Sequence, residues 1–100
     1  MDGTAHKREK RLVIDYQGRV QGVGFRFTAN ELAGRHKVKG FVRNEWDGSV
    51  HLEAEGQVRD VEAFAAALSA SRLGRYIHGA QRRWTEATGE FTTFEIRHTR

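Results

Sequence analysis

The stretch LVIDYQGRVQGVGFRFTANELA, residues 12–33, contains the pattern of a strand, a loop and a helix in direct succession. In its first part, Leu12, Ile14 and Tyr16 occupy alternate positions. A period of two is typical of a half-buried strand, and this strand is predicted to end near Gly18. The domain is therefore expected to begin with a strand that leads into a glycine-bearing loop.

A loop from Gly18 to Gly24 leads into a segment with a different period. Here the apolar residues stand at i, i+4, i+7 and i+8, which is the stripe of an amphipathic helix. They are Phe25, Ala29, Leu32 and Ala33. The helix is predicted to end between Gly34 and Lys37, where the stripe stops.

The rest of the chain supplies more strands and one more helix. A second strand is predicted from Phe41, and the Asp47-Gly48 pair is a hairpin signal that leads into an antiparallel third strand. Helical spacing returns after Gly56 and predicts a second helix of about a dozen residues. Two weaker strand candidates follow at residues 77–84 and 91–97.

This order of elements defines the expected architecture. Two helices must bury their apolar stripes on one face of an antiparallel four- to five-stranded sheet, which is the ferredoxin-like split βαβ sandwich of the α+β class. Residues 11–100 are expected to form this one domain, and residues 1–10 a short disordered basic lead. Because many unrelated activities share the plan, it does not by itself identify a function.

Composition limits the kinds of partner. The 100 residues include 17 Lys and Arg against 13 Asp and Glu, a formal charge of +4 with a pI near 10.0, which favours an anionic partner. The chain has no cysteine, and its five histidines show no metal-ligand spacing, so we expect neither a disulfide nor a metal site. No apolar run near residue 1 has the length of a signal peptide or a membrane span. We therefore expect a cytoplasmic protein that does not attach to membranes. We also expect a monomer.

The loop before the first helix has the composition of an anion-binding site. Its three glycines allow successive backbone N–H groups to point inward, and the dipole at a helix N-terminus also favours negative charge. Arg26, in the first turn of the helix, adds a planar bidentate guanidinium for the same anion. The alternative is a tight turn whose glycines only permit positive φ, with Arg26 a solvated residue. Asn44, at a strand end beside a turn, is by itself typical of a cap or turn residue.

Together, two segments of the chain resemble the acylphosphatase family. The first signature of that family, Gly-x-Val-Gln-Gly-Val-x-(Phe/Tyr)-Arg, is matched from Gly18 to Arg26. The second signature begins with a Gly, an aromatic, a small apolar residue, a polar residue and Asn, which here is Asn44. It is matched from Gly40 to Gly56. The spacing between Arg26 and Asn44 also agrees with the family.

The resemblance implies an enzyme that hydrolyses the carboxyl–phosphate bond of a small-molecule acyl phosphate. It implies that the loop and Arg26 hold the phosphate while Asn44 orients a water molecule for in-line attack on phosphorus. The implied phosphate-binding residues are Gln21, Gly22, Val23, Gly24, Phe25 and Arg26, and the implied catalytic residues are Arg26 and Asn44. No metal, no cofactor and no covalent enzyme intermediate are implied. Inorganic phosphate or sulfate is expected to inhibit.

One departure from the family pattern concerns the end of the first helix. Family members usually have Leu-Gly-Leu or a similar sequence just before the second signature, whereas this chain has His36-Lys37-Val38. The change bears on the helix C-cap, where glycine commonly adopts a left-handed conformation.

Other conspicuous side chains have simpler expected roles. Residues expected in the core are Phe91, Phe94 and Ile96. Trp46 is expected to cover packed residues, with a place at the edge of the site as the alternative. Candidate general bases by residue type alone are Asp15, Glu31 and Glu45.

Two alternative functions belong to other classes. The ferredoxin-like fold also carries the RNA-recognition motif, and Lys39-Gly40-Phe41 begins like its aromatic strand signature. The next positions are Val42 and Arg43 instead of a small residue and a second aromatic, so nucleic acid is not the favoured partner. The second alternative is a non-catalytic, accessory acylphosphatase-like domain of a larger carbamoyl-transfer protein.

Overall fold

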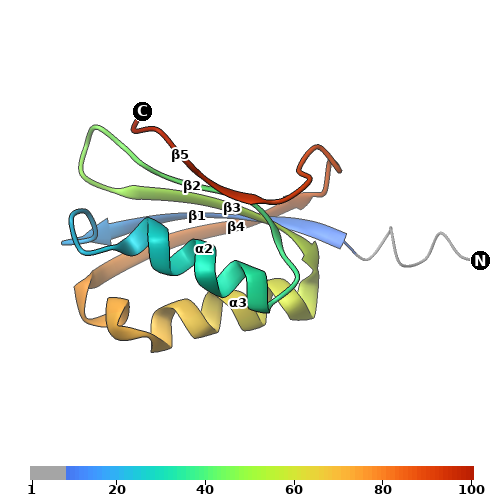
Figure 1. The fold of residues 1–100 in the computed structure, drawn as a ribbon, viewed down its shortest axis with the longest axis horizontal. Helices are drawn as coiled ribbons and strands as arrows, with labels where there is room; N and C mark the ends of the chain where they lie inside the picture. Colours follow the sequence, from blue (N-terminus) through green and yellow to red (C-terminus); the bar gives the residue numbers. More distant parts are fainter. Residues whose placement is uncertain (1–8) are drawn as a thin grey trace, which may run out of the picture.

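The computed structural model describes residues 9–100, which form a five-stranded sheet with two α-helices on one face (Figure 1). The elements in chain order are β1 (Glu9–Gly18), α2 (Phe25–Arg35), β2 (Lys39–Asn44), β3 (Val50–Gln57), α3 (Val58–Ala70), the short 3₁₀-helix η1 (Arg72–Tyr76), β4 (Ile77–Glu86) and β5 (Phe94–Arg97). The strand order in the sheet is β4-β1-β3-β2-β5. The predicted α+β, ferredoxin-like fold is confirmed.

Two details differ from the expected architecture. The first strand begins at Glu9, so Lys10 also pairs with β3, although both residues were assigned to the lead; residues 1–8 lie outside the described part of the chain. The sheet is also not wholly antiparallel, because β5 pairs with β2 in parallel. This follows from the path of the chain. Strands β1 and β2 both run antiparallel to β3, and the chain reverses after β4, so β5 runs in the direction of β2.

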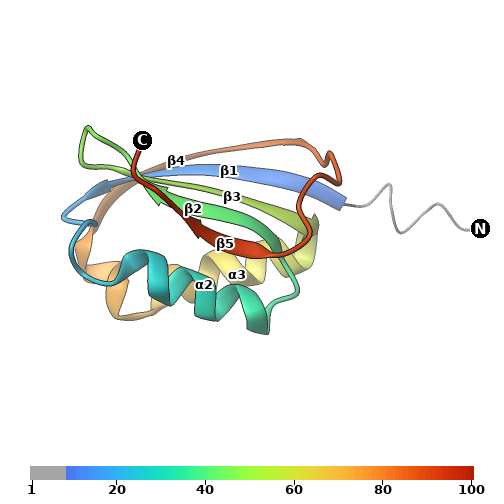
Figure 2. The same ribbon diagram turned by 45° about the horizontal axis from the view of Figure 1, so that its top comes forward.

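The hydrophobic core lies between the sheet and the two helices (Figure 2). Its strand residues come from alternate positions of β1 to β3, including Leu12, Ile14, Tyr16, Val42 and Leu52, and from Phe94 of β5. The helices contribute Phe25, Ala29 and Ala33 from α2 and Val61, Phe64, Ala65 and Leu68 from α3. The periods of two and of 3.6 in the sequence therefore correspond to one shared apolar layer.

The end of α2 shows the consequence of the His36-Lys37-Val38 departure. The backbone N–H of His36 donates to the carbonyl of Ala33, and Lys37 then takes a left-handed conformation with a φ of 57°. Among residues 9–100, Lys37 is the one non-glycine residue with positive φ. A Cβ in that conformation lowers the stability of the fold by about 1 kcal/mol. The chain therefore ends α2 with a left-handed residue as a glycine would, but at a cost in stability.

A buried carboxylate on the other face of the sheet anchors the crossover from β4 to β5. Glu55 is only 2% exposed, and its oxygens accept hydrogen bonds from Arg11 Nε at 2.8 Å, from the Thr88 N–H at 2.9 Å and from the Gly89 N–H at 3.1 Å. Burial by itself raises the pKa of Glu55, but these donors outweigh it and hold the pKa below its usual value of 4.5. The ionised form of Glu55 therefore stabilises the crossover that leads into β5.

We expect Glu55→Gln to lower the free energy of unfolding by about 2 kcal/mol at neutral pH, because an amide replaces a buried acceptor of charged and backbone donors. Since the folded pKa lies below the unfolded one, the contribution of Glu55 is complete above about pH 4.5 and is lost as the pH falls through the folded pKa. Melting curves recorded from neutral pH down to about pH 3 should show the melting temperatures of the wild type and of the variant converging as the pH falls. Glu86→Gln, at the exposed end of β4 with a surface ion pair to Lys10, is the matched control and should melt nearly like the wild type. A constant difference at every pH would contradict this role of the Glu55 carboxylate.

Candidate active site

The loop between β1 and α2 takes a conformation that only glycine adopts easily. Gly22 and Gly24 both have a φ of 78°, in the left-handed region. Gly24 is the N-cap of α2, and its carbonyl accepts a hydrogen bond from the Thr28 N–H at 3.0 Å. The N–H groups at the start of α2 therefore have no intrahelical partner, and no side chain of the described residues caps them. These donors and the helix dipole make the loop attractive to an anion.

Side chains of the loop fix its position on the rest of the domain. The amide nitrogen of Gln21 donates to the carbonyls of Glu45 and Ser49, both at 2.8 Å, on the hairpin that joins β2 to β3. The ring of Phe25 is buried, and its centroid lies 5.0 Å from that of Tyr16. The loop is thereby tied both to the core and to the hairpin that follows Asn44.

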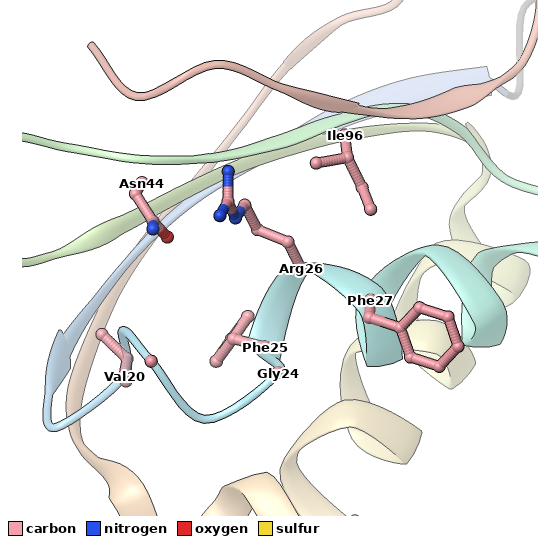
Figure 3. Close-up of a pocket in the computed structure, with 8 residues that line it drawn as sticks. Val20, Gly24, Phe25, Arg26, Phe27, Asn44 and Ile96 are labelled. Carbon is pink, nitrogen blue, oxygen red and sulfur yellow. The ribbon is translucent and has the colours of Figure 1, made fainter.

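Arg26 and Asn44 line one pocket of about 270 Å³ with the glycine loop. In Figure 3 the guanidinium of Arg26 extends from the first turn of α2 toward the amide of Asn44 at the end of β2. The one hydrogen bond of Arg26 within residues 9–100 is a long contact of 3.4 Å from Nη1 to the Arg97 carbonyl. Most of its donors therefore remain available to a ligand.

The backbone around Asn44 is held by the end of the chain. Its carbonyl accepts a hydrogen bond from the Arg100 N–H at 3.0 Å, and the Trp46 N–H donates to the Arg100 carbonyl at 2.9 Å. These contacts use only backbone atoms of Asn44. Its side-chain amide remains directed at the pocket (Figure 3).

The structure brings together most of the residues that the sequence singles out. Those that line the pocket are Gly22, Gly24, Phe25, Arg26 and Asn44. Gln21 and Val23 do not line it, because the amide of Gln21 binds the hairpin and Val23 packs against the core.

None of the three candidate general bases lines this pocket. Asp15 contacts Nδ1 of His51 at 2.7 Å on the outer face of the sheet, and Glu45 pairs with Arg43. Glu31 lies on the exposed side of α2 beside Arg35. Within residues 9–100, no carboxylate lines the pocket, and Arg26 supplies a positive charge, so the pocket is suited to a dianion.

The sequence did not indicate three further lining residues, Val20, Phe27 and Ile96. The prediction that Ile96 belongs to the core is wrong, since this side chain is 44% exposed, whereas Phe91 and Phe94 are buried as expected. Trp46 is 84% exposed, so it is not a packed residue, and it is not among the described residues that line the pocket. The sequence contains one signal for Phe27, because this apolar residue lies off the buried stripe of α2.

Phe41 is not available to stack on a nucleic-acid base. It is 4% exposed, with the guanidinium carbon of Arg97 4.0 Å from its ring centroid and the ring of Phe91 at 5.9 Å. Recognition of single-stranded RNA on such a sheet depends on exposed aromatic rings. The strand signature that suggested an RNA-binding module therefore has a packing role here.

The fold and the pocket together define a class: a small ferredoxin-like α+β domain with unpaired loop amides, an arginine and an asparagine around one cavity. Comparison with known proteins gives the family. The acylphosphatase family model matches residues 12–96. An acylphosphatase of Paenarthrobacter aurescens is 42% identical over 86 residues, which are 86% of this chain and 92% of that protein. The chain therefore belongs to the acylphosphatase family, whose members are enzymes.

Solved structures agree with this assignment. The crystal structure of acylphosphatase from Bacillus subtilis superposes with a TM-score of 0.81 at 28% identity, over 88% of this chain and 98% of that one. Full-length HypF in its phosphate- and nucleotide-bound form gives a TM-score of 0.81 at 31% identity, over 91% of this chain but only 12% of that one. The same domain thus also occurs as a small part of a much longer protein. Within residues 9–100, neither helix has the length and apolarity that a membrane span requires.

Proposed function

We propose that the chain hydrolyses acyl phosphates by direct attack of water on phosphorus. The water oxygen forms a new bond to phosphorus, and the bond from phosphorus to the bridging oxygen breaks. The bonding electrons leave with that oxygen as a carboxylate, and the second product is inorganic phosphate with release of a proton. The observation that carries this proposal is the convergence of Arg26, Asn44 and the glycine loop on one small pocket.

In this proposal, Arg26 and the loop amides hold the phosphate. A guanidinium binds two phosphate oxygens through its planar fork, and the amides before and within the first turn of α2 bind the others. Phosphoryl transfer requires positioning and charge stabilisation more than a reactive side chain. Inorganic phosphate and sulfate are tetrahedral anions like the phosphoryl group of the substrate, so they should inhibit competitively.

Asn44 orients the attacking water. An amide both donates and accepts hydrogen bonds, so it can hold a water molecule in one orientation without removing its proton. The carboxylate is a good leaving group, so a general base is not needed. The absence of a carboxylate from the pocket lining supports this division of roles.

A hydrolysis assay with benzoyl phosphate in the presence of a metal chelator tests this function. We expect release of benzoate and phosphate, with saturation kinetics and competitive inhibition by phosphate. No hydrolysis of benzoyl phosphate or of acetyl phosphate would contradict the proposal. A cytoplasmic location and a monomeric state also belong to this proposal; gel filtration checks the second.

A second candidate is an accessory, non-catalytic domain; the match to HypF shows that a domain of this fold also occurs within a longer protein. Such a domain would bind phosphate in the same pocket without turning over an acyl phosphate. The same assay separates the two, because phosphate binding without hydrolysis would favour the accessory role.

A further inference from the structure

Two large apolar side chains are exposed at the pocket that contains Arg26 and Asn44. Phe27 is 68% exposed, Ile96 is 44% exposed, and both line this pocket. The other large hydrophobic residues exposed within residues 9–100 are Trp46, Val58 and Trp84, none of which lines it. Single exposed apolar residues are ordinary. Two that line the same pocket as an arginine and a glycine loop call for a reason.

The packing of the core does not explain either side chain. Phe27 lies two positions after Phe25 and therefore off the buried stripe of α2. Ile96 shares a face of β5 with Phe94, but Phe94 packs its ring against Phe64 of α3, whereas Ile96 lies over the start of α2 (Figure 3). Both side chains are held by regular elements, so their positions at the pocket are defined by the fold.

The pocket has a polar part and an apolar part. In Figure 3 the amide of Asn44 lies on one side of the Arg26 side chain, and Ile96 and Phe27 lie on the other. An acyl phosphate has the same division: a dianionic phosphoryl group is joined through one oxygen to an acyl group. With the phosphate at Arg26 and the glycine loop, the acyl group has an apolar surface beside it.

We propose that Phe27 and Ile96 form the binding site for the acyl group and select acyl phosphates whose acyl group is bulky and apolar. This inference rests on the proposed hydrolytic function. An aromatic acyl group removes apolar surface of both side chains from water, while an acetyl or carbamoyl group removes little. The contact is the same in the bound substrate and in the transition state, so it acts on KM and leaves kcat nearly unchanged.

The experiment compares two substrates with the wild type and with Phe27→Ala. We expect KM for benzoyl phosphate to rise about 5- to 10-fold in the variant, while KM for acetyl phosphate changes less than about 2-fold. Inhibition by inorganic phosphate, which has no acyl group, should be unchanged. Ile96→Ala should shift the ratio of the two KM values in the same direction. Trp46→Ala is the matched control, because it removes an exposed aromatic ring outside the pocket.

The outcomes separate the subsite from the function on which it rests. If the wild type hydrolyses both substrates and the variants leave the ratio of KM values unchanged, the subsite is wrong and the hydrolytic function stands. Equal rises for both substrates, or an altered inhibition by phosphate, would also overturn the subsite. If the wild type hydrolyses neither substrate, both proposals fail. Melting curves identify a variant that is unfolded, and exposure of both side chains predicts that none is.

Discussion

Arg26→Ala is expected to lower kcat/KM for benzoyl phosphate by about 10³-fold and to weaken inhibition by inorganic phosphate. The guanidinium is a charged member of the pocket lining, and its one contact within residues 9–100 is the 3.4 Å bond to a carbonyl. Its loss removes a preorganised donor pair from both the bound phosphate and the transition state, which typically costs about 3–4 kcal/mol. Steady-state kinetics and phosphate inhibition constants measure both effects.

Arg26→Lys separates the charge of the side chain from its shape. An ammonium retains the positive charge but lacks the planar fork, so we expect a loss only slightly smaller than for alanine. Arg35→Ala, on the same helix but paired only with Glu31 at 3.9 Å on the surface, is the matched control and should behave as the wild type. Near-normal turnover by Arg26→Lys would mean that Arg26 does not bind the phosphate through its fork.

Asn44→Ala is expected to lower kcat by about 10²-fold while inhibition by phosphate changes little. The side chain faces the pocket, whereas the hydrogen bond with Arg100 uses the Asn44 carbonyl, so the variant should keep its fold. Loss of one hydrogen-bonding group that acts only in the transition state lowers kcat and kcat/KM together. The measurements are kcat, the phosphate inhibition constant and a melting curve.

Comparison of Arg26→Ala with Asn44→Ala distinguishes phosphate binding from water positioning. Arg26→Ala should affect binding and turnover, and Asn44→Ala should affect turnover alone. A folded Asn44→Ala protein that turns over at the wild-type rate would exclude a water-positioning role. A parallel loss of phosphate inhibition would instead make Asn44 a phosphate ligand.

The regular elements could be predicted because their signals are local. Alternation at Leu12, Ile14 and Tyr16 reflects one buried face of β1, and the return of helical spacing after Gly56 reflects one buried stripe of α3. The parallel pairing of β5 could not be predicted in this way. It depends on the directions of β3, β1 and β4 and on the sheet edge that β5 reaches, and no local pattern in the sequence reports these.

The residues of the candidate site also differ in whether a pattern in the sequence identifies them. Arg26 and Asn44 were identified because two specific patterns match a family, and the structure brings both to one pocket. The sequence predicted that Ile96 lies in the core together with Phe94, but the core ends between them, so Ile96 is exposed. The amide of Gln21 binds two carbonyls of a hairpin more than twenty residues away, and no local pattern reports such a contact.

The site of bond cleavage is the most direct test of the central claim, that water attacks phosphorus while Arg26 and the loop hold the phosphate. Benzoyl phosphate is hydrolysed by the wild type in water enriched in heavy oxygen, and both products are analysed by mass spectrometry. Attack on phosphorus places the label in inorganic phosphate and leaves the benzoate unlabelled. Label in the benzoate would show that water attacks the carbonyl carbon, and it would contradict the roles proposed for Arg26 and Asn44.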